Sequence, residues 1–160
     1  MARREKKAHT LSLVLGKGYA PDVWEVDVEL LDDWLKSLDI DTYDQILAAL
    51  QVLSHTGPGL GRPLVDTVVG SRHNNMKELR PGSSGRSEVR ILFAFDPKRR
   101  AILLVAGDKQ GRWEQWYKTN IPIADDRYGE HLDKLKKQDE AANAAKKAPP
   151  IKGRRKKDGK

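Results

Sequence analysis

The order of apolar and polar residues predicts that the regular structure of this chain starts with a short strand and two helices. In residues 24–29 apolar and acidic side chains alternate, which is the period of a half-buried strand. Residues 30–38 change to a helical rhythm, with apolar side chains at positions 31, 34, 35 and 38 along one stripe. A second helix is predicted to begin at Asp41, whose carboxylate can cap the first turn, and to end before the Gly-Pro-Gly at 57–59.

The second half of the chain predicts a group of strands followed by a last helix. Residues 57–75 are interrupted by glycine and proline and are predicted to be mostly loop. Strands are predicted at 76–79, 88–95 and 101–106, with a loop or short strand at 108–118 and a helix over about 124–137. The predicted order is β-α-α-β-β-β plus a C-terminal helix, which is an α+β fold with a small antiparallel or mixed sheet.

A single domain with basic ends accounts for the length and composition. The 160 residues are 38% hydrophobic, which suits one modest core. We expect a basic, flexible leader over 1–20, the folded domain over 21–140 and a disordered basic tail over 141–160, where alanine, lysine and proline dominate. The chain has no cysteine and no apolar run of about 18 residues, so we expect no disulfide, no membrane partner and a cytoplasmic location.

Charge is distributed unevenly along the chain. The formal net charge is +7, but residues 146–160 alone contain eight basic residues and one acid. Within the domain, ten acids accompany two basic residues in 21–70, whereas 71–118 contain eleven basic residues and five acids. The basic half also carries tryptophan and tyrosine, a combination that suits an anionic, aromatic ligand such as nucleic acid.

Arg90 is the first candidate site residue. Alternation in the strand at 88–96 places Val89, Ile91, Phe93 and Phe95 on one face and Arg90 on the other, with Leu92 and Ala94. An arginine in such an apolar strand needs an anionic partner. The partner is either a carboxylate, that of Glu88 or Glu78, or a phosphate group that the planar guanidinium binds with two parallel hydrogen bonds.

Further cations and aromatic side chains accompany Arg90 in the sequence. Lys77 and Arg80 fall on opposite faces of the strand at 76–80, and Arg80 is the stronger candidate because it meets the turn that carries Arg86. Lys109 lies between two glycines at a strand end, where the backbone can approach a ligand closely. The remaining candidates are Arg112, Trp113, Trp116, Tyr117 and Lys118, of which Trp116 is expected to pack under the last helix.

Several kinds of chemistry have no support in the sequence. The four histidines show no metal-ligand spacing, and no nucleophile elbow is present. We therefore expect no metal and no cofactor, and chemistry on phosphate groups carried out by cations is the leading catalytic hypothesis.

These residues, taken in this order, resemble the RelE/ParE superfamily of toxins from bacterial toxin–antitoxin pairs, and most of all its HigB-like, phage-related branch. The resemblance covers about 24–135, and the predicted β-α-α-β-β-β order agrees with the superfamily fold. The motifs that carry it are Gly57-Pro58, Leu60-Gly61-Arg62-Pro63, Met76-Lys77-Glu78-Leu79-Arg80, residues 88–96, Ala106-Gly107-Asp108-Lys109, Trp116-Tyr117 and Ile121-Pro122-Ile123-Ala124.

The resemblance implies a metal-independent endoribonuclease that cleaves mRNA, usually within the translating ribosome, and that a helix-turn-helix antitoxin neutralises. By position it implies that Arg80, Arg90 and Lys109 form the basic catalytic site, and we assign a catalytic role to Tyr117 near them as well. We assign contacts with RNA to Lys77, Arg86, Arg112, Trp113 and Lys118. Where the best-known members carry a pair of lysines on the first strand of the hairpin region, this chain has Lys77 beside Glu78.

Two functions from other classes stay open. One is a ParE-like protein that inhibits DNA gyrase by binding and has no active site. The other is a plain nucleic-acid-binding protein whose main contact is the basic tail at 146–160. Even for the ribonuclease, the proton-transfer roles are open, because a phenol with the ordinary pKa of about 10 is a poor base at neutral pH.

Overall fold

The computed structural model of the chain describes residues 23–82 and 88–147. It divides into two compact units, one that ends at Gly129 and one that begins at Glu130. The first unit contains the sheet and every candidate site residue that the structure describes, and the described part of the second unit is helical. Within the described ranges, no helix combines the length and the apolar character needed to cross a membrane.

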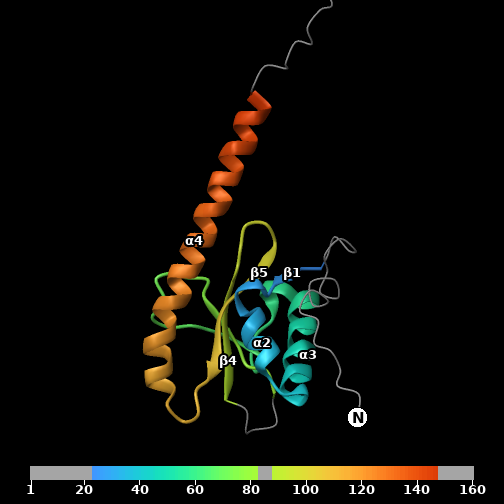
Figure 1. Ribbon diagram of the computed structural model, residues 1–160, viewed down its shortest axis with the longest axis vertical. Coiled ribbons are helices and arrows are strands. Elements are labelled where there is room, and N and C mark those ends of the chain that lie inside the picture. The colour runs from blue at the N-terminus through green and yellow to red at the C-terminus, as the bar shows by residue number, and fades with distance from the viewer. Residues whose placement is uncertain (1–22, 83–87, 148–160) are drawn as a thin grey trace, which may run out of the picture. The chain divides into compact units, whose positions relative to one another are not determined.

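The first unit is built on a mixed five-stranded sheet in the order β1-β5-β4-β3-β2. Figure 1 labels β1, β5 and β4 of this sheet. The outer strand β1 pairs in parallel with β5, and the other neighbours are antiparallel. The strands are β1 (Glu25–Asp27), β2 (Val65–Thr67), β3 (Lys77–Leu79), β4 (Val89–Phe95) and β5 (Arg100–Asp108). The predicted α+β class with a mixed sheet and a C-terminal helix is confirmed.

Helices lie on both faces of this sheet (Figure 1). One face packs on α2 and α3, whose apolar side chains form a continuous core with alternate residues of β4, among them Val89, Ile91 and Phe93. The other face meets the first turns of α4, where Arg127 Nη1 donates a 2.6 Å hydrogen bond to the Leu104 carbonyl oxygen. The helical segments are η1 (Glu29–Leu31), α2 (Asp32–Ser37), α3 (Ile40–Thr56), η2 (Gly57–Gly59) and α4 (Trp113–Lys147).

A tryptophan ties the edge of the sheet to the end of α3. The backbone N–H of Trp24 donates to the Ser54 carbonyl oxygen at 2.9 Å, and Ser54 Oγ donates back to the Trp24 carbonyl oxygen at 2.6 Å. The indole lies directly over Gly57, whose φ of 68° is in the left-handed region. It also meets the Phe95 ring edge to face, with 4.9 Å between centroids. This contact closes the core beneath β1.

The structure corrects the predicted beginning of the second helix. The N-cap of α3 is Asp39, not Asp41, because its carboxylate accepts hydrogen bonds from the Thr42 backbone N–H at 3.0 Å and from the Thr42 hydroxyl at 2.7 Å. The predicted loop at 57–75 contains β2, a three-residue strand that is too short to show a period in the sequence. This strand is defined by its antiparallel pairing with β3.

The last helix differs most from the prediction. It begins at Trp113, inside the segment predicted as loop or short strand. The prediction missed these turns because a proline at position 122 indicates a helix break, whereas α4 accommodates this proline within the helix. The helix continues to Lys147, so residues 141–147 are helical, as their alanine and lysine content favours. Residues 1–22 and 148–160, which hold the predicted leader and most of the predicted tail, lie outside the described residues, and the limits of these segments stay a prediction.

We predict that Gly57→Ala destabilises the fold by about 3 kcal/mol. An added Cβ would lie 2.4 Å from Trp24 Nε1, and alanine is strained at this positive φ. Urea unfolding followed by fluorescence measures the loss. Gly59→Ala is the matched control in the same turn, because a Cβ there meets nothing within 4 Å. Equal stability of the two variants would contradict the proposed contact.

Candidate functional site

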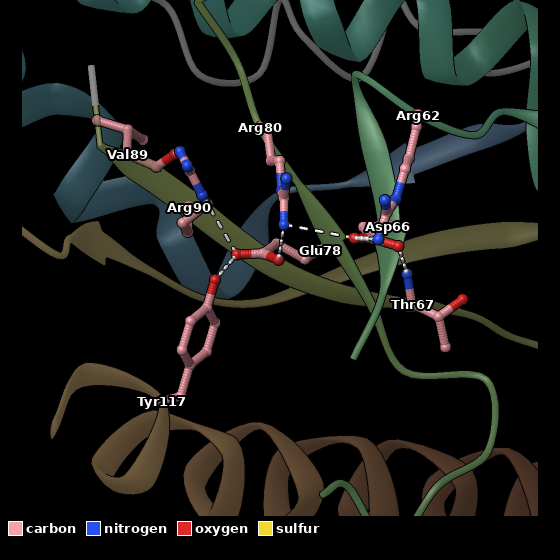
Figure 2. A network of polar contacts seen from close by, with 8 residues as sticks. All are labelled: Arg62, Asp66, Thr67, Glu78, Arg80, Val89, Arg90 and Tyr117. Carbon is pink, nitrogen blue, oxygen red and sulfur yellow. Dashed lines mark hydrogen bonds and ion pairs between the residues drawn. The ribbon is translucent and has the colours of Figure 1, made fainter. Parts of the chain in front are cut away.

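A buried carboxylate lies at the centre of the candidate site. The side chain of Glu78, on β3, is only 5% exposed. Figure 2 shows the side chains of Arg80, Arg90 and Tyr117 converging on it from different elements. Tyr117 O–H donates a hydrogen bond to Glu78 Oε1, Arg90 Nε lies 3.3 Å from the same oxygen, and Arg80 Nη2 lies 3.4 Å from Oε2. Burial of a carboxylate costs free energy unless such partners are present.

Strand register explains why these groups meet. Glu78 pairs with Leu92 across β3 and β4, and side chains of paired residues lie on the same face of a sheet. Arg90 is two residues from Leu92, so it shares that face with Glu78. It is the face that the first turns of α4 cover, and Tyr117 comes from these turns.

Arg90 is an ion-pair partner of Glu78, one of the alternatives that the sequence leaves open. Its side chain is 14% exposed, and Nη1 donates a 2.8 Å hydrogen bond to the Val89 carbonyl oxygen. Its buried Nε lies within ion-pair distance of Glu78 but has no aligned hydrogen-bond acceptor among the described residues. Glu88, the other predicted partner, accepts a hydrogen bond from the Gly111 backbone N–H. The guanidinium of Arg90 is thus held by charge more than by hydrogen bonds.

A second carboxylate continues the network along the sheet edge. Arg80 Nη2 lies 3.4 Å from Asp66 Oδ2 on β2, and Arg62 Nη2 lies 2.9 Å from the same oxygen. The hydrogen bond from Arg62, followed by that from the Thr67 backbone N–H, lowers the pKa of Asp66. Arg80 therefore bridges two carboxylates. With 38% of its side chain exposed, it is more accessible to solvent than Arg90, of which 14% is exposed.

Tyr117 is held in its protonated form. Burial is the first cause and the hydrogen bond to Glu78 the second, and with the negative charge of Glu78 they raise the pKa of Tyr117 to about 12 against the opposing charges of Arg90 and Arg80. Lys109 Nζ lies 5.8 Å from the centroid of the Tyr117 ring. At neutral pH this phenol is a hydrogen-bond donor flanked by a third cation.

Close packing of a glycine and a tryptophan positions Tyr117. After β5 the chain turns through Gly111, whose φ is 75°, and enters α4. The Trp116 indole then lies on Gly107 of β5, where an added Cβ would be 2.7 Å from its Nε1. The prediction that Trp116 packs under the last helix is therefore wrong in its detail: the residue belongs to that helix and packs on the sheet, which fixes the rotation of the first turns of α4.

An open pocket of about 510 Å³ lies beside this network. Its apolar side includes Trp113 and Ile121, and its charged and phenolic lining residues are Asp66, Glu78, Arg80, Lys109, Glu114 and Tyr117. This volume lies within the usual range of small-molecule sites. Trp113 is 54% exposed, so one large aromatic surface is available to a ligand at the rim.

The structure gathers some of the candidate residues and separates others. Arg80, Arg90 and Tyr117 contact Glu78, and Arg80, Lys109 and Tyr117 also line the pocket. The exposed Arg112 and Lys118 line a neighbouring depression together with Trp113. Lys77 pairs with Phe93 and shares the opposite face of β3 with the core residue Leu79, so it is not part of this cluster. Arg86 lies outside the described residues.

Sequence reasoning missed the central position of Glu78 and the contribution of Asp66. The alternation that places Glu78 and Arg80 on one face is visible in the sequence, but the phenol that comes from α4 is not. In the described ranges, no three His, Cys, Asp or Glu side chains are arranged to hold a metal ion.

The sequence of this chain matches a phage-derived protein family. Residues 33–129 match the family described as "Phage derived protein Gp49-like (DUF891)", and the chain belongs to this family. This agrees with the resemblance to the HigB-like, phage-related branch of the toxin superfamily.

Two relatives from Mycobacterium tuberculosis are similar to this chain. The protein named "Putative toxin HigB2" is 63% identical over 109 residues, which are 68% of this chain and 54% of that protein. The protein named "Putative toxin HigB3" is 50% identical over 97 residues, which are 61% of this chain and 82% of that protein. This chain thus covers about half the length of the first relative and most of the second.

We predict that Gly107→Ala lowers the free energy of unfolding by about 1–3 kcal/mol, because the added methyl group displaces Trp116 and with it the first turns of α4. Urea denaturation measures the change. Gly61→Ala is the control, since its Cβ meets nothing within 4 Å. If Gly107→Ala is as stable as this control, the packing of Trp116 on β5 does not position α4.

Proposed function

We propose that this protein is the toxin component of a toxin–antitoxin pair and that it is a metal-independent endoribonuclease that cleaves mRNA, with the ribosome as the place of action. The family membership and the names of the two relatives support the toxin role. The observation that carries the enzymatic part is the convergence of two guanidinium groups and a phenol on one buried carboxylate, beside Lys109 and an open pocket.

Such a cluster suits RNA cleavage by the substrate's own 2′-hydroxyl. In that reaction the hydroxyl oxygen attacks the adjacent phosphorus, and negative charge grows on the phosphoryl oxygens. The protein must align the attack and stabilise this charge. Four cations, Arg62, Arg80, Arg90 and Lys109, accompany three carboxylates, Asp66, Glu78 and Glu114, so one positive charge remains after the ion pairs are made.

The two arginines differ in what they can offer a phosphate group. Arg80 is more exposed, lines the pocket and bridges two carboxylates at 3.4 Å, a distance that indicates weak hydrogen bonds. A phosphate oxygen can replace one of these partners. Arg90 is buried more deeply and contributes mainly its charge. We therefore assign the first contact with phosphate to Arg80 and long-range stabilisation to Arg90.

Aromatic and basic side chains beside the pocket suit the rest of an RNA strand. Trp113 exposes its indole at the rim, and stacking of a base on such a ring contributes about 1–3 kcal/mol. Arg112 and Lys118 lie beside it and are exposed, so they can contact the next phosphates. Phosphate contacts of this kind weaken with added salt.

A protein that cuts cellular mRNA needs a partner that neutralises it. We propose a helix-turn-helix antitoxin as that partner and mRNA on the ribosome as the substrate. We further propose that the basic tail adds salt-sensitive affinity for RNA without being essential. A variant that ends at Lys147 should therefore stay toxic, whereas a plain nucleic-acid-binding protein would lose its function with the tail.

We predict that Arg90→Ala abolishes growth arrest and reduces mRNA cleavage at least about 100-fold, because a positive charge that stabilises the reacting phosphate from behind Glu78 is lost. Arg90→Lys, which keeps the charge and loses the planar fork, should retain part of the activity. Induced expression with primer extension on a reporter transcript measures both effects, and circular dichroism checks the fold.

Lys36→Ala is the matched control, since it removes one exposed cation on α2, away from the site. Full arrest and cleavage by a folded Arg90→Ala variant would contradict the assignment. Arrest with intact transcripts and gyrase-dependent DNA damage would instead identify a ParE-like inhibitor.

A further inference from the structure

We propose that Tyr117 and Glu78 form a proton relay, in which Tyr117 accepts the proton of the attacking 2′-hydroxyl as it passes its own proton to Glu78. This inference rests on the proposed ribonuclease function and assigns the base that the reaction needs. Tyr117 is the group that touches the substrate, and Glu78 acts through it.

The hydrogen bond between the two side chains gives the relay its direction. Tyr117 O–H donates to Glu78 Oε1, so the phenolic oxygen keeps lone pairs for a second donor. Tyr117 also lines the pocket, whereas both oxygens of Glu78 already have partners within the protein. A substrate hydroxyl that enters the pocket can donate to the phenolic oxygen while the phenolic proton points at the carboxylate.

Tyr117 cannot do this alone at neutral pH. With a pKa of about 12, Tyr117 is ionised in only about one molecule in 10⁵ at pH 7. Transfer of the phenolic proton to Glu78 in the same step avoids a free tyrosinate. Burial and the hydrogen bond to Glu78 keep the phenol protonated. The relay needs this phenolic proton, because it is the proton that passes to Glu78.

The charged groups around the phenol come from each strand that packs near it. Glu78 lies on β3 and Arg80 directly after it, Arg90 lies on β4, and Lys109 follows β5. Asp66 on β2 is one step further away, on the other side of Arg80. The arginines flank the carboxylate, and the ammonium group of Lys109 lies over the phenol ring and lines the same pocket, so it can give a proton to a leaving group bound there.

The step balances with these groups alone. The bond from O2′ to phosphorus forms as the bond from phosphorus to O5′ breaks. The 2′-hydroxyl proton moves to Tyr117 Oη, the Tyr117 proton moves to Glu78 Oε1, and Lys109 gives a proton to O5′. The products carry a 2′,3′-cyclic phosphate and a 5′-hydroxyl, and water then returns the proton from Glu78 to Lys109.

The dependence of the rate on pH tests the relay. We compare the full-length protein with Glu78→Gln in single-turnover cleavage of a defined mRNA, free and on programmed ribosomes, between about pH 6 and 9. The wild-type rate should change little, because no tyrosinate has to form. Glu78→Gln should be at least about 100-fold slower at pH 7, and its rate should rise about tenfold per pH unit, because it follows the tyrosinate fraction.

Binding separates this effect from a loss of substrate affinity. Glu78→Gln removes a negative charge between two arginines, so the Kd for an RNA with a 2′-deoxy nucleotide at the cleavage position should be unchanged or lower. Asp33→Asn is the matched control: it removes an exposed negative charge from α2, which packs on the opposite face of the sheet, and should leave the rate and the pH profile unchanged.

Tyr117→Phe provides a second variant that loses one hydroxyl group and keeps the ring. Its rate should also fall at least about 100-fold and rise about tenfold per pH unit, because hydroxide must then act as the base. The double variant should be no slower than Tyr117→Phe, because the two residues act as a unit. This variant decides the question if Glu78→Gln does not fold.

Three outcomes overturn the relay. A slow Glu78→Gln variant with an unchanged pH profile would show that Glu78 only holds the arginines. Wild-type rates in Tyr117→Phe would show that the phenol takes no part. A wild-type protein that cuts neither free nor ribosome-bound mRNA would refute the proposed function itself, and the relay with it.

Discussion

The candidate site depends on one constraint: the carboxylate of Glu78 is buried between a sheet and a helix. Water does not stabilise this charge, so the protein has to. It does so with two guanidinium groups and one phenol, each from a different part of the chain. Because all three partners are turned toward the same two oxygens, their relative positions are set by the carboxylate as much as by their own strands and helix.

The buried carboxylate also explains how Arg80 and Arg90 can form a site although both are already ion-paired with Glu78. The cations Arg62, Arg80, Arg90 and Lys109 outnumber the carboxylates Asp66, Glu78 and Glu114 by one, which leaves a small excess of positive charge. The buried pair keeps the cations in place before a substrate arrives, which lowers the cost of reorganisation at the moment of reaction. The pairing that supports the fold is therefore compatible with the stabilisation of a phosphate in the proposed reaction.

Packing on both faces of the sheet supports this arrangement. On one face the Trp24 indole lies on Gly57, and on the other the Trp116 indole lies on Gly107. In both places a glycine allows a large ring to approach the backbone closely, and the ring then fixes a neighbouring element. The first contact closes the core under β1, and the second places Tyr117 over Glu78.

The sequence predicts the parts of this structure that depend on local pattern. Alternation in β4 correctly separates Arg90 from the core residues, and the α+β order with a C-terminal helix is confirmed. It misses β2, since three residues have no readable period, and it misses the first turns of α4, since Pro122 indicates a break. Glu78 is named as a possible partner of Arg90, but its contact with Tyr117 joins residues 39 positions apart, and only the docking of α4 creates it.

The titration of Tyr117 tests the central claim most directly. The ring carbon that bears the hydroxyl group reports phenol ionisation by its ¹³C chemical shift, and Tyr117→Phe assigns the signal. If the phenol is buried and donates to the carboxylate of Glu78, the midpoint lies at about 12 and the signal is still that of the neutral phenol at about pH 10.5. A midpoint near the ordinary value of about 10 would contradict both the burial of Tyr117 and its hydrogen bond to Glu78, on which the account depends.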